Sequence, residues 1–201
     1  MRFAVSWRSL RRQKLAGQIT GPPATVGTME FEFLVQAGVG SRRRAELNEV
    51  RTIALSLRDA LADSGVSEAL ARIAPIGGTS HAVDAVVRPV AESFGFTSQK
   101  NDLFIEYPIR LRPDWFRPVG QSGILLEVER GKTLANNMDL LDLWKCHICR
   151  EADHLFLVVP LKVRRTRSTE NVYSRVVGRM GTFVMPENEV NVISIAVLGY
   201  Q

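Results

Sequence analysis

Residues 112–133 read RPDWFRPVGQSGILLEVERGKT, and this stretch predicts a β-hairpin at the centre of the fold. The segment Pro118–Gly123 carries turn residues, and the chain then returns as a strand over residues 124–130. In a hairpin centred within this turn, facing residues have numbers that sum to about 241, so we expect Asp114 opposite Glu127.

The returning strand is apolar, yet it ends in two acidic residues. Because successive side chains of a strand alternate between its faces, Glu127 and Glu129 share one face, while Leu126 and Val128 point into the core on the other. With Asp114, three carboxylates are then expected to converge on a small volume. Buried carboxylates are costly unless a cation meets them, and oxygen-rich clusters suit Mg²⁺.

The surrounding pattern predicts helices followed by the order β, β, α, β, α, β. We expect strands over residues 30–35, 103–116, 124–130, 154–161 and 191–198. Helices are expected after Ser41 and over 67–73, from Ser80 onward with a kink or break at Pro89, and over 136–152 and 172–180. In the helix 136–152, the apolar spacing predicts a buried face of Leu141, Trp144, Ile148 and Ala152. The fold class is therefore an α/β sandwich with a mixed central sheet.

Composition sets the class of protein. With 201 residues, 45% of them hydrophobic, the chain suits one globular domain over residues 29–201, preceded by a poorly ordered basic extension, 1–28. That extension holds five of the 26 basic residues and no acidic one, so the net charge of +5 comes from it alone. No apolar run is long enough to span a bilayer, and two cysteines imply no disulfide framework, so we expect a cytoplasmic protein without a membrane partner.

Clustered basic residues are the candidates for contact with nucleic-acid phosphates, although such clusters are commonly just solvated surface. They are Arg42, Arg43 and Arg44, and Arg164, Arg165 and Arg167.

A zinc site built from Cys146, His147, Cys149, Asp153 and His154 is disfavoured, because the two cysteines lie within one predicted helix. We expect small buried thiols there instead.

The run Pro113-Asp114, then Glu127-Val128-Glu129, resembles the PD-(D/E)xK signature of the restriction endonuclease-like nuclease superfamily. Glutamate stands where that motif usually has lysine, which is similar to the E-x-E variant of restriction enzymes of the BamHI and BglII type. The resemblance covers roughly residues 80–165. It implies a three-layer αβα sandwich, Mg²⁺ as cofactor, DNA as substrate and, for double-strand cuts, a homodimer.

The resemblance also implies roles for individual residues. Asp114, Glu127 and the carbonyl of Val128 would bind the metal, while Glu129 would orient water or help to hold a second metal. A catalytic cation would come from Lys132 or Lys145, and an additional acid from Asp84 or Glu92. A non-catalytic DNA-binding or interaction module of the same fold is the alternative, and a repair or RNA-directed nuclease is a third hypothesis.

Overall fold

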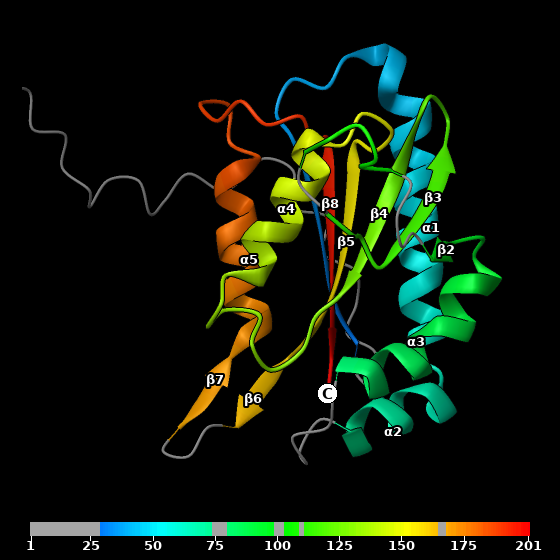
Figure 1. Cartoon of the computed structure of the whole chain (residues 1–201), viewed down its shortest axis with the longest axis vertical. Helices are drawn as coiled ribbons and strands as arrows, with labels where there is room; N and C mark the ends of the chain where they lie inside the picture. The colour runs from blue at the N-terminus through cyan, green and yellow to red at the C-terminus, as the bar shows by residue number, and fades with distance from the viewer. Residues whose placement is uncertain (1–28, 74–79, 99–102, 109–110, 165–167) are drawn as a thin grey trace, which may run out of the picture.

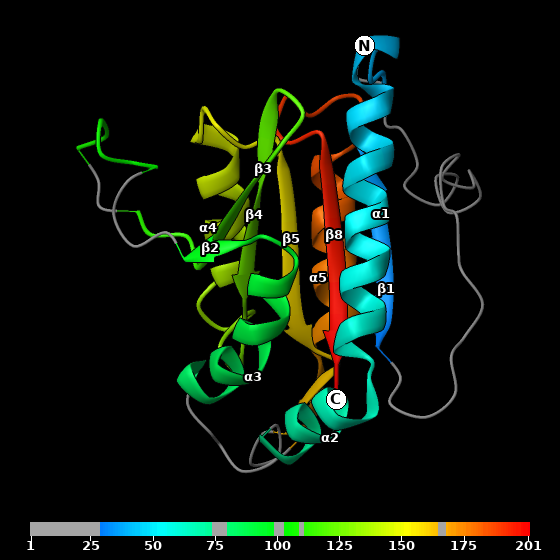
Figure 2. The same cartoon turned by 90° about the vertical axis from the view of Figure 1, so that its right-hand side faces the viewer.

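The computed structural model describes residues 29–73, 80–98, 103–108, 111–164 and 168–201. Its centre is a six-stranded sheet with helices on both faces, as Figures 1 and 2 show from two sides. The three-layer sandwich with a mixed sheet expected from the sequence is therefore confirmed. The expected basic extension 1–28 lies outside the described residues.

The sheet has the strand order β1-β8-β5-β4-β3-β2. Strands β4, β5 and β8 run parallel to one another, and β1, β3 and β2 add antiparallel edges. The bounds are β1 Glu30–Val35, β2 Thr97–Ser98, β3 Trp115–Val119, β4 Ser122–Val128, β5 His154–Pro160 and β8 Ser194–Tyr200. A separate two-stranded sheet joins β6 (Lys162–Arg164) to β7 (Thr169–Asn171).

The register of the β3–β4 hairpin agrees with the sequence prediction. Trp115 pairs with Leu126 and Val119 with Ser122, so the facing numbers sum to 241 throughout. At the turn, Gly120 has a φ of +54°, a conformation that favours glycine. Extending this register by one pair brings Asp114 opposite Glu127.

Each face of the sheet has its own core. Helices α1 (Arg44–Leu61), α2 (Ser64–Ile73) and α3 (Ser80–Ser93) pack on the face that carries Leu126 and Val128. Helices α4 (Met138–Ile148) and α5 (Val172–Phe183) pack on the opposite face. Helix α4 is the crossover from β4 to β5, so it lies over the face to which Glu127 belongs.

Three local predictions differ from the structure, wholly or in part. Residues 103–108 form turns rather than a strand, with Phe104 buried against Tyr107. Helix α3 continues through Pro89 to Ser93, so the expected break is absent, while the kink expected as its alternative stays a prediction. Ser41 begins a single turn of 3-10 helix, Ser41–Arg43, and does not cap α1.

The predicted buried face of the helix 136–152 was right for Ala152, which is buried, and for Ile148, which is partly buried against the core, but wrong for Leu141 and Trp144. Trp144 is 55% exposed and Leu141 39%, whereas Asp142 and Lys145 are buried. The helix buries Asp142, Leu143, Lys145 and Cys146, so charged side chains share its buried face with apolar ones. Cys146 and Cys149 are free and buried, as expected. Within the described residues, every helix is too short or too polar to cross a membrane.

Candidate active site

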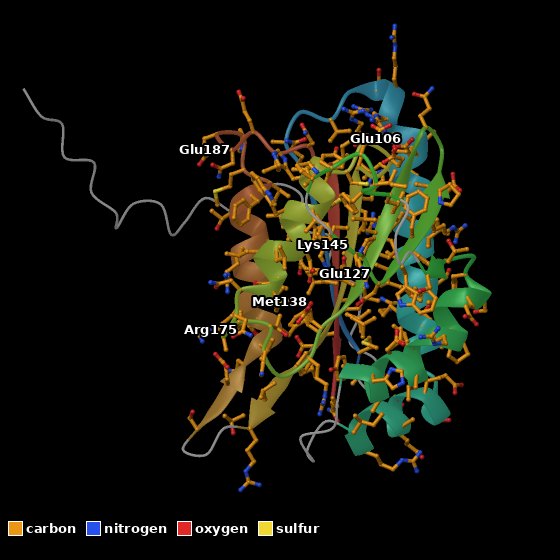
Figure 3. The ribbon with its side chains drawn as sticks, viewed as in Figure 1. Glu106, Glu127, Met138, Lys145, Arg175 and Glu187 are labelled. Atoms are coloured by element: carbon orange, nitrogen blue, oxygen red, sulfur yellow. The ribbon has the colours of Figure 1, made fainter. Side chains whose placement is uncertain are left out.

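A cluster of four carboxylates and one lysine lies near the carboxyl end of β4, between this strand and α4. We call it the acidic cluster; its members are Asp114, Glu127, Glu129, Asp142 and Lys145. Figure 3 shows Lys145 reaching from α4 toward Glu127 on β4. The strand supplies two acids, the segment before β3 supplies one, and α4 supplies an acid and the lysine.

Asp114 and Glu127 are joined by reciprocal hydrogen bonds at the end of the hairpin. The backbone N–H of Asp114 donates to Glu127 Oε2 at 3.2 Å, and the N–H of Val128 donates to Asp114 Oδ2 at 2.9 Å. Asp114 is exposed at the rim, whereas Glu127 is only 2% exposed. The structure thus brings these two predicted site residues together and gives the cluster an opening to solvent at Asp114.

Lys145 is the cation that contacts the carboxylates. Its Nζ donates to Glu127 Oε1 at 3.0 Å and to Asp142 Oδ1 at 2.8 Å, and all three side chains are buried. Lys132, the other lysine considered, is exposed in the loop after β4. Helical spacing explains the pair of Asp142 and Lys145, since residues three apart lie on the same side of a helix.

Glu129 is half-buried and lies beside Asp142. Its backbone is fixed on both sides: the N–H donates to Val158 O on β5 at 2.8 Å, and the carbonyl accepts from Tyr200 Oη on β8 at 3.1 Å. The end of β4 is therefore held in place by its parallel neighbours, which positions the Glu129 side chain within the cluster.

The cluster carries more negative charge than its lysine can neutralise. Burial, followed by repulsion from Asp142, raises the pKa of Glu129 to about 8. The same two causes raise the pKa of Glu127 well above its ordinary value, and burial raises the pKa of Asp142. Burial alone would lower the pKa of Lys145, but Glu127 and Asp142 raise it, so the ammonium stays charged.

The other predicted residues stand apart from the cluster or at its edge. Desolvation raises the pKa of Asp114 most, and Asp84 on α3 lies near enough to raise it further. Asp84 also pairs with Arg88, and Glu92 is exposed. The side chain of Val128 lies in the opposite core, and the predicted role of its carbonyl stays a prediction.

The predicted arginine clusters lie at opposite ends of the parallel strands. Arg43 is bound to Glu46 and to Asp153, next to the start of β5, while Arg42 and Arg44 are exposed beside it. Arg164 is exposed on β6, just past the carboxyl end of β5. Arg165 and Arg167 lie outside the described residues.

Sequence reasoning missed Asp142 because an acid on a predicted amphipathic helix is usually solvated. The available signal was its spacing of three residues from Lys145 on a helix that directly follows Glu129.

Sequence reasoning also missed a buried polar chain in which His154 lies 2.8 Å from Ser194 Oγ and 3.2 Å from Glu46 Oε1. Ser194 is fully buried, so this chain ties α1 to β5 and β8 rather than exposing a nucleophile.

Comparisons with known proteins leave the family open. No family model matches the chain, and no curated protein matches it. Among solved structures, it is similar to the crystal structure of restriction endonuclease BglII complexed with a DNA 16-mer. That similarity covers 86% of this chain and 78% of the other, with 11% sequence identity and a TM-score of 0.43. It assigns neither a family nor an activity, so the proposal below is based on the acidic cluster itself.

Proposed function

We propose that the chain is a Mg²⁺-dependent endonuclease that hydrolyses phosphodiester bonds in DNA. The observation that carries the proposal is the acidic cluster, in which four carboxylates surround one lysine at the end of β4. Such an excess of buried negative charge is relieved by protons or by a hard cation. Strongly perturbed carboxylates at an opening to solvent are also frequent at catalytic sites.

The donor atoms fit magnesium in their chemistry. The cluster offers only oxygen ligands, and Asp142 Oδ2 is buried without a hydrogen-bond partner in the described part of the chain. Among the described residues, however, no three acidic, histidine or cysteine side chains already stand as a metal-binding group. Lys145 Nζ lies between Glu127 and Asp142 instead, so metal binding requires side chains to rearrange.

Asp114, Glu127, Glu129 and the Val128 carbonyl are the groups that would hold Mg²⁺. When bound, Mg²⁺ supplies a Lewis acid for a phosphate oxygen and lowers the pKa of water. Glu129, with a pKa of about 8, can hold a proton near neutral pH and exchange it within the site. The Lys145 ammonium, which is held against Glu127, is the cation that would stabilise negative charge on the phosphate.

Basic side chains near the acidic cluster would meet the DNA backbone. Lys132 is exposed in the loop that follows β4, and Lys162 and Arg164 are exposed on β6, which follows β5. Both elements begin at the carboxyl ends of parallel strands, the end of the sheet at which the cluster lies. Cations there neutralise phosphates without regard to sequence.

The test is cleavage of supercoiled plasmid by the purified full-length protein with Mg²⁺, with EDTA as the metal-free control. We expect Asp114→Ala and Glu127→Ala to lose at least about 100-fold in rate, the loss typical when a metal or charge-stabilising group is removed. Glu49→Ala is the matched control, because Glu49 is an exposed acid on α1 away from the cluster. Parallel arms with single-stranded RNA and with nicked DNA distinguish the RNA-directed and repair nucleases.

The lysine role has its own test. Lys145→Met should abolish cleavage, and adding Glu129→Lys should restore part of it by returning a lysine to the strand. If wild type leaves DNA intact in every arm but still shifts it on a gel, the nuclease proposal is wrong and the DNA-binding module is favoured. For double-strand cleavage we propose a homodimer with one site per subunit, which sedimentation of the protein on DNA would measure.

A further inference from the structure

Helix α4 buries charged side chains beside apolar ones: Asp142 and Lys145 share its buried face with Leu143 and Cys146. It leaves Trp144 55% and Leu141 39% exposed, while it buries Asp142 completely and Lys145 to 7% exposure. Burying Trp144 would stabilise the fold by about 25 cal/mol per Å² of apolar surface removed from water. The observed orientation forgoes that gain and keeps two charged groups out of water. This orientation places the Lys145 ammonium against Glu127.

The bonds of Lys145 leave one donor for a ligand. An ammonium carries three N–H groups. In the described structure one donates to Glu127 Oε1 and one to Asp142 Oδ1, which lies three residues earlier on the same helix. Two fixed acceptors, one from the strand and one from the helix, define where the third N–H points. A flexible lysine held by Glu127 alone would lack this definition, because its side chain has many rotamers.

Asp142 is poorly explained as a stabilising ion pair. Only its Oδ1 accepts from Lys145, while its Oδ2 is buried on the side of Glu129 and takes no part in the ion pair. Buried ion pairs are in general weak contributors to stability. This oxygen lies beside Glu129, so the carboxylate faces the acidic cluster rather than the helix interior.

We propose that Asp142 is a positioning residue that holds the Lys145 ammonium so that its remaining N–H faces the scissile phosphate. The inference rests on the proposed nuclease function and deepens it, since Asp142 acts through Lys145 and need not touch the substrate. The motif usually has its lysine on the strand, where this chain has Glu129. In this proposal the lysine comes from α4 instead, as Lys145 held by Asp142.

Steady-state cleavage by three variants tests the proposal. Asp142→Ala removes the second acceptor and should lower kcat by about 10- to 100-fold, while KM for DNA changes by no more than about twofold. Asp142→Asn keeps a carbonyl oxygen for Lys145 and should recover most of kcat. Asp139→Asn is the matched control: Asp139 is a fully buried acid one turn earlier on α4, and it pairs with Arg179 on α5 instead. Its kcat should stay at the wild-type value.

A second readout does not depend on cleavage. In protein labelled with ¹⁵N-lysine, the buried Lys145 ammonium should give a slowly exchanging Nζ–H signal, identified by its loss in Lys145→Met. Asp142→Ala should shift or broaden this signal, and Asp139→Asn should leave it in place. If Asp142→Ala does not fold, Asp142→Ser replaces it in both assays.

The outcomes separate the two proposals. An Asp142→Ala variant with wild-type kcat, or with an unchanged Lys145 signal, overturns the positioning role. The same holds if Asp139→Asn is as impaired as Asp142→Ala, since the loss would then be a general effect of disturbing α4. If wild type does not cut DNA, the nuclease function fails, and the ammonium signal still decides whether Asp142 holds Lys145.

Discussion

Replacing Glu129 with glutamine should stabilise the metal-free protein at alkaline pH. Glu129 has an ordinary pKa of 4.5 and a pKa of about 8 in the folded chain, because burial and Asp142 disfavour its charged form. The folded state therefore binds a proton that the unfolded state has released, so stability is greatest at low pH and falls as pH rises from 4.5 toward 8. Glutamine has the same shape without this proton.

The magnitude follows from the two pKa values. A rise from 4.5 to about 8 corresponds to at most ~5 kcal/mol of destabilisation above pH 8. Glu129 is only half-buried and shares its protonation with Asp142, so water and rearrangement reduce this figure. We expect Glu129→Gln to raise the free energy of unfolding by about 2 kcal/mol at pH 8.5, with a smaller gain at pH 6.

The assay is urea unfolding in EDTA at these two pH values, with Glu49→Gln as the exposed control. Adding Mg²⁺ at pH 8.5 should then stabilise wild type more than Glu129→Gln, because a ligand that binds only the folded state raises its stability. The reasoning is refuted if Glu129→Gln is no more stable than wild type at pH 8.5, or if its gain is the same at both pH values.

Three further predictions concern the scaffold. Trp115→Ala should cost about 3–5 kcal/mol in urea unfolding because its ring is buried, whereas Trp144→Ala should cost less than about 1 kcal/mol; equal losses would contradict the orientation of α4. Gly120→Ala should lower stability by about 2 kcal/mol, since φ is +54° and a new Cβ would collide with the Glu46 carboxylate; a neutral result would exclude this turn. Burial lowers the pKa of His154 from 6.5, so its contribution to stability is present above pH 6.5 and is lost as pH falls below it. His154→Gln should reduce the loss of stability below pH 6.5, and an unchanged loss would show that another group causes it.

The hairpin could be predicted from sequence because its determinants are local. The turn between Pro118 and Gly123 sets the register, and the register places Asp114 against Glu127 without reference to the rest of the chain. The buried strand β5 was equally clear, since all seven of its residues are buried and the six that follow His154 are apolar or proline.

The orientation of α4 could not be predicted in the same way. Apolar spacing favours Leu141 and Trp144 as the buried face, and nothing local indicates that Lys145 will bind Glu127, 18 residues earlier on another element. The prediction for residues 103–108 was wrong for a related reason: their loose alternation was interpreted as a strand, but Phe104 is buried by turns in which it packs on Tyr107. In both cases tertiary contacts override the local pattern.

The alternation of β4 restricts which insertions and deletions the hairpin can tolerate. Leu126 and Val128 belong to one core, and Glu127 belongs to the acidic cluster on the other face. Losing or gaining one residue within β4 would send the carboxylates into the core and the apolar side chains into the site. Changes by two residues keep both faces intact. Homologous chains with this site should therefore change the length of β4 itself only by even numbers.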